Sequence, residues 1–263
     1  MDAKEKLINF YSIGWELNWL KEVGNRAFKR YKYRMLDTID LIEQNTLENF
    51  SILDVGCGIG LYSLEILRRF KNCTLTGLDI SKRQIDFLNK NLVASFKDRA
   101  EFIVADAEDF NLAKKYEYII CTEVLEHFQN PKSVIRNIIL HASNSTKIII
   151  SVPHIYLSGK SGWFYRQFIN DSRWIETQDF SKISPKKEYY EFYHKQYDVE
   201  EIEALLNDSD LSIDKIRYCN LRLTNKHLKA AYFFIAFRRL DKFLNWLTLN
   251  KHASNITLLC KKN

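Results

Sequence analysis

Residues 52–60 read Ile-Leu-Asp-Val-Gly-Cys-Gly-Ile-Gly, a short apolar run that ends in a glycine turn. A helical pattern of apolar residues follows at once, so the stretch predicts a strand, a tight turn and a helix. Gly56, Gly58 and Gly60 let the backbone approach a ligand closely, because they carry no Cβ. The spacing differs from the GxGxxG of dinucleotide sites, since Leu61 stands where the third glycine would be. The stretch therefore disfavours a nicotinamide enzyme.

Asp54 stands just ahead of this turn and narrows the choice of ligand. A carboxylate at that point repels a pyrophosphate and suits a cation, such as the ammonium of an amino-acid group. The alternative is an ordinary strand–turn–helix that needs its glycines for geometry alone. Taken by itself, the turn leaves both interpretations open.

Two further acids follow at the expected tips of the next two strands. Asp79 lies 19 positions after Gly60, where an acid accepts hydrogen bonds from ribose hydroxyls. Asp79 can instead cap the following helix, a role that Ser81 fills equally well. Asp106 is placed to accept from an adenine amino group, although it can also be one of several loop acids.

Apolar strands alternate with helical segments along residues 48–153. This alternation predicts an α/β fold, with a mostly parallel sheet covered by helices on both faces. The expected strands are Ser51–Val55, Thr74–Asp79, Glu101–Ala105, Tyr118–Thr122 and Thr146–Val152. The expected helices are Leu61–Phe70, Lys82–Phe96, Pro131–Ala142 and Val199–Asn207. Two late strands, Leu211–Tyr218 and Ile256–Lys261, are expected beside the fifth, one of them antiparallel.

We expect residues 1–263 to form one domain. Its expected parts are N-terminal helices over 1–47, a ligand-binding core over 48–153, an aromatic cap over 154–197, and C-terminal strands over 198–263 with a helical insertion over 220–255. The five cysteines are odd in number and form no CxxC pair, which argues against a disulfide framework and a zinc site. The N-terminal sequence lacks the apolar core of a signal peptide, and no uncharged apolar run reaches about 18 residues. A cytoplasmic protein is expected.

Four motifs, DVGCGIG, GLDIS, VADAED and TEVLEHFQNP, occur in this order and spacing. Together they resemble class I S-adenosylmethionine (SAM)-dependent methyltransferases, most closely the small-molecule enzymes with EVLEH after the fourth strand. The resemblance implies a Rossmann-like seven-stranded sheet with one antiparallel strand and SAM as the cofactor. The cofactor-binding residues that it implies are Tyr11, Asp54, Gly56, Cys57, Gly58, Gly60, Asp79, Ile80, Asp106, Ala107, Thr122 and Glu123.

The resemblance also implies a direct in-line attack of the acceptor on the methyl group. A general base is needed only where the attacking atom arrives with a proton. His127, His154 and His194 are the candidates, because the imidazole pKa lies near neutrality. For each histidine a structural role is the simpler interpretation. Glu123, Glu126 and His127 do not have the spacing of a tetrahedral ligand set, so no metal is expected.

The expected acceptor is a small molecule of the natural-product, sugar or quinone-like kind, attacking through oxygen, nitrogen or carbon. A nucleic-acid methyltransferase is the alternative, but the chain lacks the Asn/Asp-Pro-Pro-aromatic turn of enzymes that methylate base amino groups. A SAM-binding protein without catalysis is a further alternative. Residues 228–247 carry an apolar stripe at helical spacing beside basic residues, which fits membrane contact, burial against the cap or dimerisation. The sequence thus leaves open whether the protein is a monomer or a homodimer.

Overall fold

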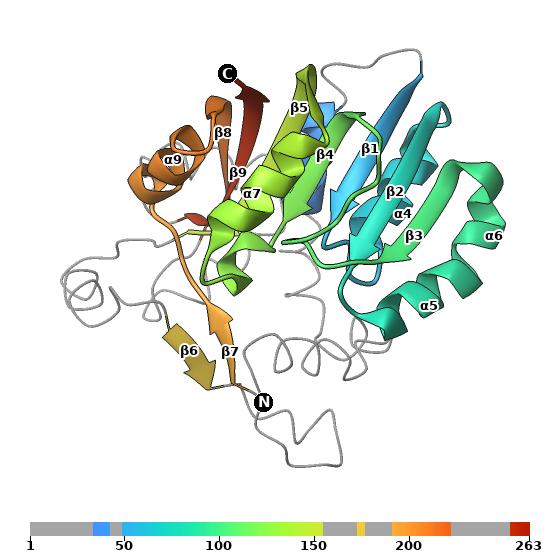
Figure 1. Ribbon diagram of the computed structural model, residues 1–263, viewed down its shortest axis with the longest axis horizontal. Helices are drawn as coiled ribbons and strands as arrows, with labels where there is room; N and C mark the ends of the chain where they lie inside the picture. The colour runs from blue at the N-terminus through green and yellow to red at the C-terminus, as the bar shows by residue number, and fades with distance from the viewer. Residues whose placement is uncertain (1–33, 43–48, 155–172, 177–190, 222–252) are drawn as a thin grey trace.

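The computed structural model describes residues 34–42, 49–154, 173–176, 191–221 and 253–263 (Figure 1). Its centre is a seven-stranded sheet in the order β3-β2-β1-β4-β5-β9-β8. β9 is antiparallel to both of its neighbours, and the other neighbouring strands of this sheet are parallel. The strands are β1 (Phe50–Val55), β2 (Cys73–Asp79), β3 (Ala100–Val104), β4 (Tyr116–Thr122), β5 (Ala142–Pro153), β8 (Leu211–Leu221) and β9 (Ala253–Lys262). The predicted sheet, with its single antiparallel strand, is confirmed.

Helices cover both faces of this sheet, as Figure 1 shows. They are α4 (Leu61–Arg69), α5 (Lys82–Asn91), α6 (Val93–Phe96), α7 (Pro131–Leu140) and α9 (Val199–Asn207), together with the helical residues 34–42. Two short 3₁₀ helices, η1 (Lys97–Arg99) and η2 (Leu125–His127), lie in the connections. These layers bury every residue of β1, as expected of a strand that is covered on both faces.

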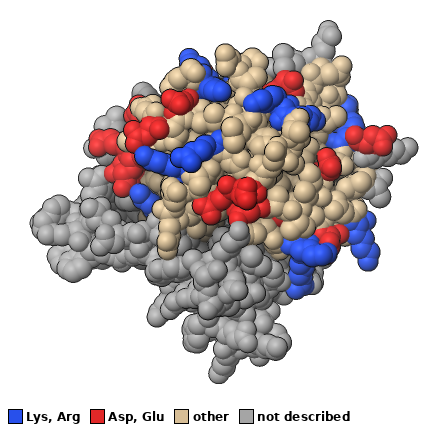
Figure 2. All heavy atoms as spheres, in the orientation of Figure 1, with Lys and Arg blue, Asp and Glu red and all other residues tan. Residues whose placement is uncertain are grey.

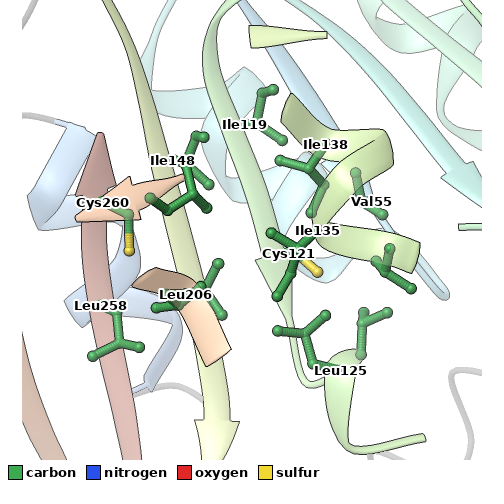
Figure 3. Close-up of a cluster of buried hydrophobic side chains, with 14 of the residues drawn as sticks. Val55, Ile119, Cys121, Leu125, Ile135, Ile138, Ile148, Leu206, Leu258 and Cys260 are labelled. Atoms are coloured by element: carbon green, nitrogen blue, oxygen red, sulfur yellow. The ribbon is translucent and has the colours of Figure 1, made fainter. Parts of the chain in front are cut away.

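Successive residues of the central strands face opposite sides, so the core falls into two apolar clusters. Leu53 and Val55 of β1 join α7 and α9 in one cluster, part of which Figure 3 shows. Ile52 faces the other way and joins α4, α5 and residues 34–42. Residues 34–42 are fastened to the sheet edge, because Arg217 of β8 donates to the carbonyl of Asp37 at 2.8 Å.

Some predicted boundaries are wrong. The helix expected to reach Ala142 ends at Leu140, and Ala142 already pairs with β4 as the first residue of β5. The amide of His141 donates to the carbonyls of Ile138 and Ile139, so the helix ends here although the sequence has no Gly or Pro at this point. The helix expected over residues 82–96 is divided into α5 and α6, which meet at Leu92.

The segments expected as cap and insertion are described only in part. Two short antiparallel strands, β6 (Arg173–Glu176) and β7 (Glu191–His194), lie in the expected cap, where the sequence shows no clear period. Residues 220 and 221 belong to β8 and residue 253 begins β9, so the predicted insertion bounds of 220 and 255 are too wide. Residues 155–172, 177–190 and 222–252 of these segments, and residues 1–33 and 43–48 of the N-terminal part, lie outside the described ones.

Candidate functional site

The glycine turn after β1 has the backbone that its sequence predicts. Gly56, Gly58 and Gly60 have φ of 71°, 55° and 76°, in the left-handed region that favours glycine. The amides of Gly56 and Cys57 both donate to the carbonyl of Leu78 in β2, at 2.8 and 2.9 Å. The turn is thus bound to the tip of the neighbouring strand, at the edge where parallel α/β sheets hold ligands.

Space around the three glycines differs. A Cβ on Gly56 would meet the Val124 side chain, and one on Gly60 would lie 2.6 Å from Leu88. A Cβ on Gly58 would lie 3.6 Å from Gln84 Oε1, an ordinary van der Waals contact, so of the three glycines only this one has room for a Cβ. Gly56 and Gly60 therefore allow the turn to pack closely against neighbouring side chains, whereas the position of Gly58 is less crowded.

Asp79 connects the first two loops of the site. Its Oδ2 accepts from the amide of Gly58 at 2.9 Å, and its Oδ1 accepts from the amide of Ser81 at 2.8 Å. The Ser81 side chain makes no capping bond to α5, so Asp79 also serves the start of that helix. Burial raises the pKa of Asp79, whereas the two amide bonds lower it. Its carboxylate braces the glycine turn, and each oxygen keeps a lone pair for a ligand hydroxyl.

Asp54 lies behind the turn and is buried. The Ser63 hydroxyl of α4 donates to its Oδ2 at 2.6 Å. Burial raises the pKa of Asp54 from 3.8 to about 7; the Ser63 hydrogen bond opposes this shift, and nearby Asp79 adds to it. A cation beside Asp54 would supply the countercharge that the described residues around it do not.

The residues predicted to contact the adenine ring, Asp106 and Ala107, lie after β3. Asp106 Oδ1 accepts from the amide of Glu108 at 3.0 Å, which closes a small turn. Ala107 is buried against the core, whereas Glu108 and Asp109 are exposed. Asp106 therefore has a local structural role in addition to any contact with a ligand.

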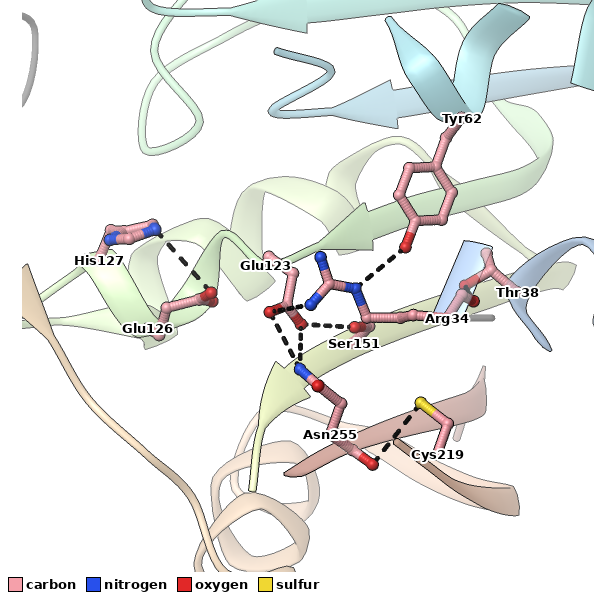
Figure 4. Close-up of polar contacts among 9 residues, drawn as sticks. All are labelled: Arg34, Thr38, Tyr62, Glu123, Glu126, His127, Ser151, Cys219 and Asn255. Atoms are coloured by element: carbon pink, nitrogen blue, oxygen red, sulfur yellow. Dashed lines mark hydrogen bonds and ion pairs between the residues drawn. The ribbon is translucent and has the colours of Figure 1, made fainter. Parts of the chain in front are cut away.

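Glu123, directly after β4, is the centre of a polar network (Figure 4). Its Oε1 accepts from the Ser151 hydroxyl of β5 at 2.7 Å, and Asn255 Nδ2 of β9 donates to both carboxylate oxygens at 3.2 and 3.1 Å. Arg34 Nη1 pairs with Oε2 at 2.6 Å, and Arg34 Nε donates to the Tyr62 hydroxyl at 3.3 Å. Glu123 has φ of 56°, a conformation that costs energy for a residue with a Cβ. Its carboxylate is therefore held by two strands, β5 and β9, and by the helical residues 34–42.

Sequence reasoning missed Arg34, Ser151 and Asn255 as members of this site. They come from three distant parts of the chain, and none lies in a local motif. Thr122, which was predicted, is buried at the end of β4 beside Glu123. The structure thus brings Asp54, Asp79 and Glu123 to one edge of the sheet, as the sequence predicted.

The three candidate histidines have different surroundings. His127 Nε2 lies 3.8 Å from Glu126 Oε1, beside the network. His154 is buried, its Nδ1 lies 3.0 Å from the Ala253 carbonyl, and burial lowers its pKa. His154 therefore holds the start of β9 against the end of β5. His194 ends β7, and its side chain, like the whole of Tyr11, lies outside the described residues.

Two further features of the described residues concern metal and membrane binding. In those ranges no three His, Cys, Asp or Glu side chains are grouped so as to hold a metal ion. Among the helices that the structure describes, none is long and apolar enough to cross a membrane. Residues 228–247, with their predicted apolar stripe, lie outside those ranges.

Known proteins are similar to this chain in sequence and in fold. Malonyl-[acyl-carrier protein] O-methyltransferase 2 of Ilyobacter polytropus is 32% identical over 114 residues, which is 42% of this chain and only 43% of that protein. Ubiquinone biosynthesis O-methyltransferase of Rickettsia felis is 27% identical over 201 residues, which is 70% of this chain and 79% of that protein. The crystal structure of magnesium protoporphyrin IX methyltransferase from Synechocystis with bound SAH superimposes with a TM-score of 0.60 at 14% identity, covering 100% of both chains.

The family itself is shown by the match of residues 27–216 to the methyltransferase domain model. That range includes the whole glycine turn, Asp79, Asp106 and Glu123. The seven-stranded sheet agrees with the same assignment. The chain belongs to the methyltransferase domain family, and the SAM-dependent enzyme class and cofactor predicted from the four motifs are confirmed at the level of that family.

Proposed function

We propose that this chain transfers the methyl group of SAM to a small-molecule acceptor. The observation that carries the proposal is the Asp79 carboxylate, which braces the glycine turn through Gly58 and presents both oxygens at the strand tip. Gly58 is the least crowded glycine of the turn, which suits the approach of a ligand to its backbone. The relative from Rickettsia felis is named as a ubiquinone biosynthesis O-methyltransferase, and this name supports a small-molecule acceptor.

Different residues of the site would bind SAM and the methyl acceptor. When bound, SAM supplies an activated methyl group on a sulfonium sulfur. Asp79 accepts from the ribose hydroxyls, and Asp54 supplies a negative charge for the amino-acid end. Arg34 lies between Tyr62 and Glu123, where its guanidinium can also face a carboxylate. The remaining contribution of the protein is to align the acceptor and exclude water.

The described surface supports a small acceptor rather than a nucleic acid. Figure 2 shows basic and acidic side chains interspersed over the described part of one face. Lys132 pairs with Asp208 at 3.0 Å, and Lys82 pairs with Asp86 at 2.6 Å. A phosphate backbone needs a basic surface of one sign. The intermixed charges on this face do not favour that partner.

Calorimetry with S-adenosylhomocysteine (SAH) and with NAD tests the proposed function. We expect SAH to bind with one molecule per chain and NAD to give no measurable heat of binding, because Asp54 opposes a pyrophosphate. A labelled-methyl assay against a panel of small acceptors follows. Tight NAD binding, or no binding of SAH, would overturn the proposal.

The affinity for SAH should depend on pH through Asp54. In the ligand-free protein the pKa of Asp54 is raised by burial to about 7, whereas an ammonium group beside it favours the ionised form. Binding below about pH 7 therefore releases a proton. Affinity should increase by up to about tenfold per pH unit towards about pH 7 and then level off. Calorimetry from about pH 5.5 to about pH 8 measures this profile.

Two variants test the origin of this pH dependence. Asp54→Asn should remove the part of the affinity profile that rises towards about pH 7. Ser63→Ala should move the midpoint of that rise to higher pH, because the Ser63 hydrogen bond lowers the Asp54 pKa. The stability of the ligand-free protein changes in the opposite sense. Between pH 3.8 and about 7 the folded state holds the Asp54 proton that the unfolded state has lost, so this contribution falls as the pH rises. An unchanged affinity profile in Asp54→Asn would contradict the assignment.

A further inference from the structure

Three polar residues of α7 and its C-terminal cap hold the connection between β3 and β4, residues 105–115. Ser133, Asn137 and His141 are four positions apart, so they lie on one face of the helix. Asn137 and His141 are buried, with 6% and 4% of their surfaces exposed, and Ser133 is half-buried. Buried polar groups of this kind are hydrogen-bonded, and here their partners lie in the β3–β4 connection.

Each of the three residues makes its own contact with the connection. The Ser133 hydroxyl donates to Glu108 Oε1 at 2.5 Å. Asn137, in the orientation that satisfies its side-chain amide, accepts from the Phe110 amide at 2.8 Å and donates to the Phe110 carbonyl at 3.0 Å. The Phe110 ring stacks on the His141 imidazole, with the ring centroids 4.4 Å apart. We call Ser133, Asn137 and His141 the α7 clamp.

His141 has a defined tautomer within this clamp. The amide of Leu112 donates to its Nε2 at 3.1 Å, and its Nδ1 lies 2.8 Å from the carbonyl of Asn137. Because an amide can only donate and a carbonyl can only accept, the single ring proton is on Nδ1. The imidazole therefore joins the last turn of α7 to the β3–β4 connection. A phenylalanine here would keep a ring and lose the acceptor, whereas a glutamine would keep an acceptor and lose the ring.

The first residues of the connection lie beside Asp79. The amide of Ala105 donates to the Asp79 carbonyl at 3.0 Å. The sheet order places β3 on the side of β2 that is remote from β1 and its glycine turn. A cofactor with its amino-acid end at the glycine turn and its ribose at Asp79 would therefore extend its base towards Asp106 and Ala107.

Asp106 is linked to the α7 clamp through a closed turn. The amide of Asp109 donates to the Asp106 carbonyl at 3.0 Å, and the amide of Glu108 donates to Asp106 Oδ1 at the same distance. Phe110, which Asn137 binds on both of its backbone groups, follows this turn directly. The position of the Asp106 carboxylate therefore depends on the clamp.

We propose that Asn137 and His141 are positioning residues that make the cofactor site selective for a 6-aminopurine. The inference rests on the proposed function. The two residues act through the β3–β4 connection, which they hold so that the Asp106 carboxylate meets the edge of the base. A carboxylate accepts from the amino group of adenine and repels the carbonyl oxygen that hypoxanthine has at the same position.

Calorimetry compares SAH with S-inosylhomocysteine, which has a carbonyl oxygen in place of the 6-amino group. The wild type should prefer SAH by about 10- to 100-fold, the range for one hydrogen bond to a charged group. His141→Phe should reduce this preference to less than about threefold, because the Leu112 amide loses its acceptor. His141→Gln should keep the preference within about threefold of the wild type. Arg136→Gln, at an exposed position of α7, is the matched control and should change neither affinity by more than about twofold.

Two further measurements do not depend on the folding of His141→Phe. Asn137→Ser, whose side chain is too short to reach both groups of Phe110, should lose the preference to the same extent. Nitrogen NMR of the histidine-labelled wild type should show His141 protonated at Nδ1, its signal being the one that His141→Gln lacks.

Several results would overturn the inference. They are a wild type without preference, an unchanged preference in a folded clamp variant, equal losses for both ligands, a loss in His141→Gln as large as in His141→Phe, and a His141 ring protonated at Nε2. Equal losses would leave the clamp with a structural role alone. Failure of the wild type to bind SAH would instead refute the proposed function.

Discussion

Gly56→Ala should destabilise the ligand-free protein by about 2–5 kcal/mol. A left-handed backbone costs a residue with a Cβ about 1–2 kcal/mol. Forcing the new methyl against the Val124 side chain adds about 1–3 kcal/mol, because this part of the core is already filled. Urea unfolding of the ligand-free protein measures the free-energy difference. SAH affinity should fall as well, since the displaced turn moves Gly58.

Gly58→Ala is the matched control for this prediction. Its φ of 55° imposes the same kind of strain, but its new Cβ would be 3.6 Å from the nearest atom. The expected cost is only about 1–2 kcal/mol. In the double variant Gly56→Ala/Val124→Ala the packing part of the loss should be recovered, which a double-mutant cycle detects. Equal losses for the two single glycine variants would show that Val124 does not limit the turn.

Asp79→Ala should weaken SAH binding by about 1.5–3 kcal/mol, the usual loss for a hydrogen-bonding charged group. The variant removes the acceptor for ligand hydroxyls and also releases the Gly58 amide, which positions the glycine turn. Calorimetry with SAH measures the affinity. Asp86→Ala, an exposed residue of α5 paired with Lys82, is the control and should change affinity by less than about 0.5 kcal/mol.

Stability measurements separate the two roles of Asp79. Asp79→Asn keeps one carbonyl oxygen for the Ser81 or Gly58 amide but loses the charge and the second acceptor. We expect it to remain close to wild type in urea unfolding while losing most of the SAH affinity. Unchanged affinity together with a large loss of stability would make Asp79 a structural brace only.

The sequence predicted those parts of the site that depend on neighbours in the chain. The glycine turn and the acid at 79 are local features, because a strand tip and a tight turn restrict which residues fit. Arg34 and Asn255 could not be found in this way. Each reaches Glu123 only through the packing of distant elements, and neither has a local pattern that marks it.

The wrong prediction of where α7 ends has a related cause. The apolar residues of α7 run on into His141 and Ala142 without a breaker, so periodicity alone cannot end the helix there. The left-handed backbone at Glu123 is equally invisible in the sequence, since glutamate has no preference for it. It is held by the surrounding donors. Those donors lie on strands that are distant in the sequence and adjacent only in the folded sheet.

The order of the strands has a consequence for synthesis of the chain. β9 lies between β5 and β8, and β8 pairs only with β9 among the described strands. As the chain leaves the ribosome, β8 emerges before the strand that joins it to the rest of the sheet. Asn255, 132 positions after Glu123, also arrives at that late stage. The polar network therefore closes only when β9 docks, and the nascent protein cannot have a complete site until β9 has emerged.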